Sequence, residues 1–129
     1  MGQSNCHPQP GDLIEIKRSL IYQHWALYVG DGYVIHVADI EARSGLGSSS
    51  PMFAKGAKVK KELLTEVARN DKWVVNNKYD RKLTPLPVEK IIQHAESLID
   101  MEIPYSVFGN NCEHLVTLLR YDDKISDQV

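Results

Sequence analysis

Alternating apolar and polar positions in the first third of the chain predict β-strands. Residues 13–17, Leu-Ile-Glu-Ile-Lys, follow the turn signal Pro10-Gly11-Asp12 and alternate as a half-buried strand does. The runs 24–29 and 33–38 are rich in β-branched and aromatic residues, and Gly30-Asp31-Gly32 separates them. Such residues suit a pleated surface, so these two runs predict a β-hairpin.

Beyond the hairpin the pattern is less regular. Residues 43–51 are rich in Gly and Ser and cannot repay the entropy of being ordered, which predicts a mobile loop. The stretch 59–64 fits a strand or a helix, and we interpret it as a strand followed by a short helical turn through Ala68. Residues 73–75, Trp-Val-Val, predict a further strand.

Two later segments carry apolar residues at helical spacing. The first follows Pro87, which suits a first helical turn, and its apolar stripe consists of Val88, Ile91, Ile92, Ala95, Leu98 and Ile99. The second begins near Asn110-Asn111, and its stripe consists of Cys112, Leu115, Val116 and Leu119. Together the elements predict an α+β fold, in which about three α-helices pack against one face of a small antiparallel β-sheet.

Length and composition restrict this picture to one domain. The chain has 129 residues, a formal net charge of −2 and two cysteines. We expect a single domain over 1–129, with a flexible lead-in at 1–9 and a flexible tail at 122–129. The near-neutral charge argues against a dedicated nucleic-acid binder, and two cysteines cannot form the framework of a small secreted scaffold. No apolar run approaches the ~20 residues that span a bilayer, and no secretory signal is present, which favours the cytoplasm.

Cys112 is a candidate nucleophile because of its place in the chain. Asn110 or Asn111 is a favoured N-cap, so the cysteine falls in the first turn of the second helix. Unpaired N–H groups and the helix dipole favour a thiolate there, and the same amides could stabilise an oxyanion. Cys112 also lies on the apolar stripe, where a free cysteine often serves as a small core residue. Position alone leaves both interpretations open.

A thiol nucleophile needs a base, and the sequence holds five histidines. Three are poorly placed: one lies in the lead-in, one on the polar face of the first helix, and one only two positions after the cysteine, namely His7, His94 and His114. The remaining two, His24 and His36, lie on the two strands of the hairpin. Lone histidines on strands are more often hydrogen-bonded surface or core residues, so these two need a geometric test.

Strand parity provides that test. If Asp31-Gly32 formed a two-residue turn, His24 and His36 would point to opposite faces of the sheet. If Gly30-Asp31-Gly32 forms a three-residue loop, position 26 lies opposite 36, and both histidines share a face as diagonal neighbours. A three-residue hairpin favours positive φ at its last position, which Gly32 supplies, so we predict this form.

In this arrangement we expect the helix stripe that carries Cys112 to pack on the sheet face that carries His24 and His36. One histidine would take the thiol proton and the other would fix the tautomer of the first. The same three side chains could also bind zinc, although their spacing does not fit a standard finger. Metal binding is therefore the second hypothesis for these residues.

Five segments in order resemble the phospholipase A/acyltransferase family, also called the H-Ras-like suppressor family, which is related to lecithin–retinol acyltransferase. The similarity runs from about Pro10 to Tyr121, and it is carried by residues 10–15, 24–36, 75–80, 85–87 and 111–116. The family belongs to the NlpC-type thiol hydrolases, whose catalytic elements are permuted relative to papain. The resemblance thus implies a permuted papain-like fold for a single catalytic domain.

The resemblance also implies a reaction and a set of roles. Cys112 would be the nucleophile and acyl-thioester carrier, His24 the base and His36 the residue that orients it. Tyr22 is in the matching place for an oxyanion helper, and Asn111 would support the site. The implied substrates are glycerophospholipids, cleaved at the sn-1 or sn-2 ester without calcium or another cofactor. The acyl group would pass to water, to the amine of phosphatidylethanolamine or to a lysophospholipid.

Two departures from the family pattern affect what we expect. Leu115 stands where the family motif usually has Phe, a change expected to alter the pocket more than the chemistry. Many members continue into a hydrophobic C-terminal anchor, whereas this sequence stops at Val129. We expect either a truncated chain, anchored in its full-length form, or another route to the membrane.

Membrane contact and two rival functions complete the expectations. Lys55, Lys58, Lys60 and Lys61 form a local basic cluster that could dock on anionic headgroups, although a solvated charged face is the commoner explanation. We expect a monomer that is peripheral on intracellular membranes. The alternatives are a thiol peptidase or amidase of the same fold, and a non-enzymatic lipid- or protein-binding module with a buried, inert Cys112.

Overall fold

The computed structural model describes residues 7–20, 22–39, 56–104 and 111–121. The predicted Gly/Ser-rich loop at 43–51, the tail at 122–129 and most of the lead-in lie outside these residues. So does Lys55, one member of the predicted basic cluster.

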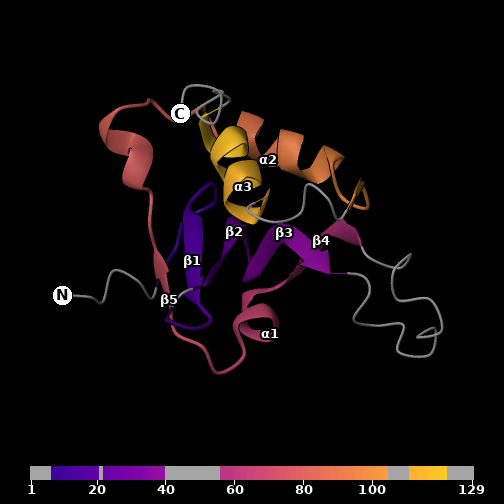
Figure 1. Cartoon of the computed structure of the whole chain (residues 1–129). Coiled ribbons are helices and arrows are strands. Elements are labelled where there is room, and N and C mark those ends of the chain that lie inside the picture. Colours follow the sequence, from indigo (N-terminus) through magenta and orange to yellow (C-terminus); the bar gives the residue numbers. More distant parts are fainter. Residues whose placement is uncertain (1–6, 21, 40–55, 105–110, 122–129) are drawn as a thin grey trace.

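An antiparallel sheet forms the centre of the described structure (Figure 1). Its strands stand in the spatial order β5-β1-β2-β3-β4-β6. Their bounds are β1 Leu13–Lys17, β2 Gln23–Gly30, β3 Tyr33–Asp39, β4 Gly56–Leu63, β5 Trp73–Val75 and β6 Glu102–Pro104. The first five strands agree with the predicted ones to within a few residues. The pattern did not predict β6, because three residues are too few to show a period.

The helices lie where the apolar spacing predicts them. Their bounds are α1 Leu64–Ala68, α2 Val88–Ser97 and α3 Asn111–Tyr121, and a 3-10 helix, η4 Lys78–Arg81, was not predicted. On α2 the buried residues are Ile91 and Ala95, whereas Val88 in the first turn is half exposed. None of the helices in the described ranges is long and apolar enough to cross a membrane.

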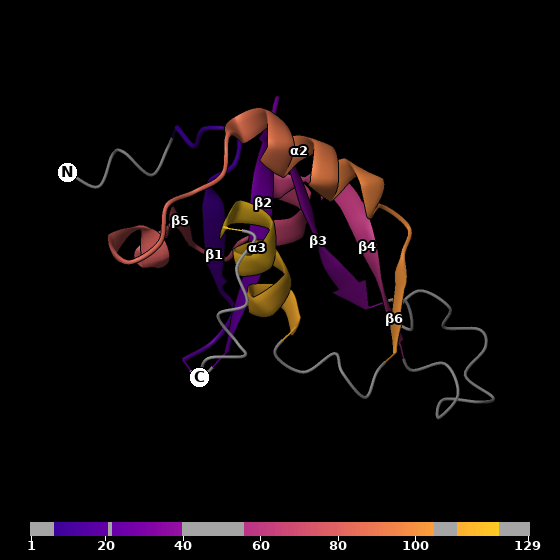
Figure 2. The same cartoon turned by 90° about the horizontal axis from the view of Figure 1, so that it is seen from above.

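The helices cover both faces of the sheet, not one as the sequence predicted (Figures 1 and 2). Val116 and Leu119 of α3 share a core with α2 and with one face of the sheet, which includes Trp25 and Leu27. Helix α1 packs on the opposite face, in a second core with residues such as Ala26. The fold class, α+β, is as predicted, but the five-residue α1 adds a layer that its short pattern could not reveal.

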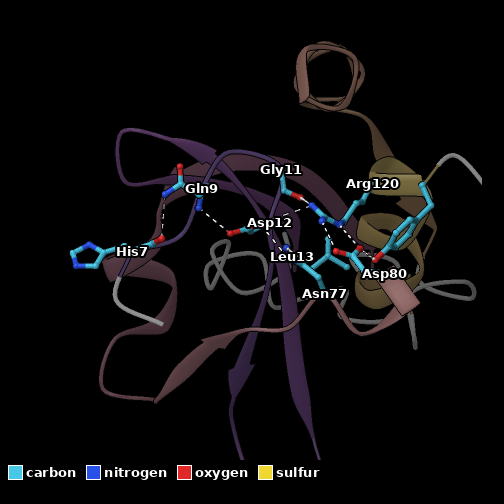
Figure 3. Close-up of polar contacts among 9 residues, drawn as sticks. His7, Gln9, Gly11, Asp12, Leu13, Asn77, Asp80 and Arg120 are labelled. Carbon is cyan, nitrogen blue, oxygen red and sulfur yellow. Dashed lines mark hydrogen bonds and ion pairs between the residues drawn. The ribbon is translucent and has the colours of Figure 1, made fainter. Parts of the chain in front are cut away.

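A partly buried polar cluster holds the C-terminal end of α3 (Figure 3). The Arg120 guanidinium donates to the Gly11 carbonyl at 2.7 Å and to both carboxylate oxygens of Asp80, at 3.1 and 2.9 Å. Asp12 lies 3.8 Å from the same guanidinium. Because Gly11 precedes β1, the last turn of α3 lies at the end of the sheet where β1 begins. The first turn of α3 therefore lies at the other end, where β1 ends and β2 begins (Figure 2).

Candidate active site

His24 and His36 lie together on one face of the sheet, as predicted. The register pairs Ile16 with His24 and Ala26 with His36, so both histidines point to the face that α1 covers. Their rings are buried, nearly perpendicular at 84°, and joined by a hydrogen bond of 2.9 Å between His24 Nε2 and His36 Nδ1. The diagonal pairing that parity predicts thus brings two imidazoles into direct contact.

The device that sets this register differs from the predicted one. Gly30 pairs with Tyr33, so the turn contains only Asp31 and Gly32, both with positive φ. A β-bulge between Tyr28 and Gly30 then shifts the register by one residue. The three-residue loop is therefore wrong, but a two-residue turn plus one bulged residue gives the same alignment.

Glu62 extends the histidine pair to a third side chain that the sequence analysis missed. His36 Nε2 lies 2.9 Å from Glu62 Oε1, across the diagonal between β3 and β4. Val34 is directly opposite Glu62, so the carboxylate lies on the same face as both histidines. The register of β4 could not be inferred from sequence, because no short turn connects β3 to β4. The available signal was the predicted strand itself, because side chains alternate along a strand and Glu62 therefore lies on the same face as Lys60.

Proton positions along this chain of three groups follow from donor and acceptor chemistry. An ionised carboxylate only accepts, so His36 donates its Nε2–H to Glu62 and keeps Nδ1 as an acceptor. His24 must then donate its Nε2–H to His36 Nδ1. The remaining ring nitrogen of His24, Nδ1, carries a free lone pair, so it is the basic atom of the group.

Burial keeps both imidazoles neutral. Desolvation, with the neighbouring His36 ring and the Arg18 guanidinium, lowers the pKa of His24 to about 3. Burial also lowers the pKa of His36, although the hydrogen bond to Glu62 and its negative charge oppose that shift. A neutral imidazole at physiological pH can accept a proton, which is the state that a general base needs.

Cys112 is the second residue of α3, in the first turn as predicted, and Asn111 is the first. The side chains of both lie outside the described part of the structure. An ion pair holds this turn: Lys78 Nζ is 3.0 Å from Glu113 Oε2 and lies over the Trp25 ring at 5.1 Å. The first turn of α3 is therefore fixed beside the residue that follows His24.

The expected packing of the cysteine stripe on the histidine face is wrong. Val116 and Leu119 of that stripe pack on the face of Trp25, whereas His24 and His36 point to the other face. A signal was present in β2, because its odd positions, from Trp25 on, are bulkier and more apolar than the even ones. The bulkier apolar face is the one that the two longer helices cover.

Tyr22 lies at the same end of the sheet as the first turn of α3, directly before β2. It is half exposed, and its backbone N–H donates to Ser19 Oγ at 3.1 Å.

The predicted basic cluster is divided by strand alternation. Lys60 of β4 pairs with His36 of β3 and so lies on the histidine face. Lys61 forms an ion pair of 3.1 Å with Glu96 of α2.

The metal hypothesis stays untested, because it includes Cys112, whose side chain lies outside the described part of the structure. Within the ranges that the structure covers, no three His, Cys, Asp or Glu side chains converge as a metal ion would require. The facing atoms of His24, His36 and Glu62 are hydrogen-bonded to one another: His24 Nε2 to His36 Nδ1, and His36 Nε2 to Glu62 Oε1.

Comparison with known proteins shows which sequences this chain is similar to. The family model described as lecithin retinol acyltransferase matches residues 6–125. Phospholipase A and acyltransferase 3 of Mus musculus is 56% identical over 124 residues, which cover 95% of this chain and 76% of that protein. Phospholipase A and acyltransferase 1 of the same species is 52% identical over 123 residues, covering 95% and 73%. Phospholipase A and acyltransferase 2 of Homo sapiens is 50% identical over 131 residues, covering 100% and 80%.

Proposed function

Because the chain belongs to the lecithin retinol acyltransferase family, we propose that it is a phospholipase A and acyltransferase that acts through Cys112, His24 and His36. The observation that carries the proposal is the buried histidine pair at the end of the sheet where α3 begins. The close relatives named phospholipase A and acyltransferase supply the substrate class, glycerophospholipids.

The thiol reaches its base around the end of the sheet in this proposal. An 11-residue helix and a five-residue strand are both about 16 Å long, so the first turn of α3 is level with the last residue of β1. His24 is the second residue of β2 and lies one step inside that end. Cys112 therefore approaches His24 from the first turn of α3, not from its packed stripe.

The reaction then follows from the proton positions. His24 Nδ1 takes the thiol proton, and the Cys112 sulfur attacks the ester carbonyl carbon. The tetrahedral intermediate collapses to a thioester, and the leaving lysophospholipid oxygen takes the proton from His24. In the second half, water, an amine or a hydroxyl group attacks the thioester, and His24 removes the proton of that acceptor. The bond between the acyl carbon and the Cys112 sulfur breaks, and His24 returns the proton to the sulfur. His36 keeps the donor nitrogen of His24 facing inward throughout.

Stabilisation of the intermediate is assigned to the first turn of α3. Backbone N–H groups of a helix N-terminus point toward bound anions, so those beside Cys112 suit the developing oxyanion. Tyr22 is the proposed second donor, because it stands at the same end of the sheet, and Asn111 supports the turn. The reaction needs no calcium in this scheme, since protein groups perform each proton transfer.

We place the enzyme at the membrane surface as a peripheral protein, because its proposed substrates are there. The catalytic domain is 1–129 in this proposal, and the chain works as a monomer in the cytoplasm, on intracellular membranes. Lys58 and Lys60 lie on the histidine face, and we assign contact with an anionic headgroup to these two described members of the basic cluster.

Replacement of the cysteine tests the proposal directly. Phosphatidylcholine vesicles with and without phosphatidylethanolamine are incubated with the protein, and the products are identified by mass spectrometry. The unmodified protein should release fatty acid and carry one acyl group on the peptide that contains Cys112. Cys112→Ala should abolish both, whereas Cys6→Ala, the matched control, should change neither. Undiminished fatty-acid release by Cys112→Ala would rule the proposal out, and cleavage of amide reporters alone would favour the peptidase.

A further inference from the structure

Glu62, His36 and His24 form a hydrogen-bonded relay, with Glu62 at the opposite end from His24. We propose that Glu62 is a positioning residue for the base. It would fix the tautomers of His36 and His24 and stabilise the charge that His24 acquires; this inference rests on the proposed function. The relevant contacts are the two hydrogen bonds of 2.9 Å that join Glu62 Oε1 to His36 Nε2 and His36 Nδ1 to His24 Nε2.

Among the described groups, Glu62 is the only member of the relay whose hydrogen-bonding role is fixed, because an ionised carboxylate can only accept. Two neutral imidazoles joined by one hydrogen bond have two equivalent proton arrangements: His24 donates to His36, or His36 donates to His24. The second places the hydrogen of His24 on Nδ1 and removes the lone pair that the thiol needs. An acceptor-only carboxylate on His36 Nε2 selects the first arrangement.

Proton transfer from the thiol places a positive charge on His24. When His24 Nδ1 has taken the thiol proton, the ring is a cation buried beside other positive groups. Arg18 faces the pair from the segment after β1, and Lys60 faces His36 from β4. Among the groups that act on the pair, Glu62 supplies the negative charge. No proton moves along the relay, since each Nε2 hydrogen stays on its own ring.

The position of Glu62 suits a role in the relay better than a role in folding. Its side chain is 39% exposed, whereas that of His36 is 6% exposed, so the carboxylate is hydrated on one side and directed inward on the other. Glu96 provides a matched control, because its side chain is 42% exposed, close to the value for Glu62. It pairs with Lys61, the residue before Glu62, on the face of the sheet that does not carry the histidines.

Two variants separate the charge of Glu62 from its acceptor. Glu62→Gln keeps an oxygen that can accept from His36 but removes the negative charge. Its kcat/KM should fall about 10-fold, and the acid limb of the pH profile should move to lower pH, because losing a nearby anion lowers the pKa of every group beside it. Glu62→Ala removes the acceptor as well and should cost about 10²-fold, since the wrong tautomer of a base is inactive.

Imidazole nitrogen NMR and thiol labelling provide readouts that do not depend on lipid turnover. In the unmodified protein, both rings should carry hydrogen on Nε2; in Glu62→Ala the ring of His36 should become a mixture of tautomers. The pH at which iodoacetamide begins to label Cys112, followed by peptide mass spectrometry, should decrease in Glu62→Gln and stay unchanged in Glu96→Gln.

The outcomes distinguish the relay from the proposed function. If Glu62→Gln keeps the pH profile of the unmodified protein and His36 keeps its tautomer in Glu62→Ala, Glu62 has no positioning role. If both readouts shift but no phospholipid is cleaved, the relay is correct and the substrate assignment is wrong. If Glu96→Gln shifts the labelling as far as Glu62→Gln does, the effect is a general surface charge and the relay is rejected.

Discussion

Two partly buried polar networks lie at opposite ends of the same sheet and differ in whether a hydrogen-bonding atom is left without a partner inside the network. At one end, the Arg120 guanidinium donates to the Gly11 carbonyl and to the Asp80 carboxylate, and the Tyr121 hydroxyl donates to that carboxylate as well. At the other end, the hydrogen bonds run in a line from His24 through His36 to Glu62. The first network is charged and closed, whereas the second is neutral at its buried end and stops at a nitrogen with a free lone pair.

The pKa shifts show the same contrast. Burial raises the pKa of Asp80, but the hydrogen bonds from Arg120 and Tyr121 outweigh it, so the net shift is downward and the charge is held. Burial lowers the pKa of His24 to about 3, and among the described residues no carboxylate contacts this ring to oppose the shift. A network that favours its charged form fastens α3, whereas one that resists charge retains the capacity to accept a proton.

Replacing His24 should produce the largest effect and confine it to chemistry. His24→Gln can still donate an amide N–H to His36 but has no basic nitrogen, so kcat/KM for fatty-acid release should fall about 10³-fold or more. The melting temperature should change by only a few degrees. The exposed His94 of α2 is the control, because His94→Gln should leave turnover unchanged. Turnover within 10-fold of the original would show that His24 is not the base.

Replacing Arg120 should give the opposite result, a loss of stability with the chemistry retained. Arg120→Ala removes three hydrogen bonds and leaves the Gly11 carbonyl unpartnered beside a cavity. Because Asp80 is 39% exposed, the unpaired carboxylate can be partly hydrated, so we expect a loss of about 2–3 kcal/mol in the free energy of unfolding. Urea unfolding measures this loss.

The folded fraction of Arg120→Ala should keep near-normal turnover at low temperature. Arg81→Ala, at an exposed position in η4, is the control for loss of a positive charge. A large fall in turnover without loss of stability would show that the two ends of the sheet are coupled through α3 and are not independent.

Mild acid should destabilise the histidine end well before the Arg120 end. The pKa of His24 is lowered from 6.5 to about 3 by folding, so between these values the unfolded chain binds a proton that the folded chain does not. Stability is therefore constant above about pH 6.5 and falls by up to about 1.4 kcal/mol per pH unit below it, for this histidine alone. His36, whose pKa is also lowered, adds a loss of the same sign.

Asp80 responds in a lower pH range. Its pKa is lowered from 3.8, so the stability it contributes is present above that value and is lost as the pH falls further. Urea unfolding at a series of pH values from 7.5 to 4.5 tests the difference. His24→Gln should flatten the slope by about 1.4 kcal/mol per pH unit at the most. An unchanged slope would mean that His24 is charged in the folded protein.

The sequence predicted the pairing of the two histidines better than it predicted which face of the sheet α3 covers. Parity between His24 and His36 depends on a short connection, so only two registers were open, and the chosen one is correct although a bulge produces it. The face that a helix covers depends on long-range packing, so the apolar stripe of α3 was assigned to the wrong face of the sheet. Glu62 was missed for a related reason, since residues 40–55 separate β4 from β3.

The Arg120 end was largely invisible to pattern analysis. Its members come from three separate segments of the chain, and a charged residue on a helix is usually solvated. Arg120 is nevertheless only 9% exposed, because the turn before β1 and the 3-10 helix η4 both fold over it. Arginine in the last turn of a helix is favoured by the helix dipole, which alone does not predict burial.

The smallest predicted effect tests whether the hydrogen bonds to Asp80 in the Arg120 network support one another. Tyr121→Phe removes the hydroxyl that donates to Asp80 but keeps the ring packed edge-on against Tyr79, with the two ring centroids 6.3 Å apart. Since Arg120 still holds Asp80, we expect a loss of about 1 kcal/mol, seen as a fall of a few degrees in melting temperature. Tyr33→Phe is the control, because that ring is 38% exposed.

Titration and a double variant make this test sharper. Burial and the hydrogen bond to Asp80 raise the pKa of Tyr121 to about 12, so its tyrosinate absorbance should be missing below about pH 11 and appear only as the protein unfolds. Tyr121 and Arg120 share one carboxylate, so the effects of Tyr121→Phe and Arg120→Ala should not add. Additive losses would mean that the cluster is a set of separate bonds, and its contrast with the cooperative relay at the histidine end would then weaken.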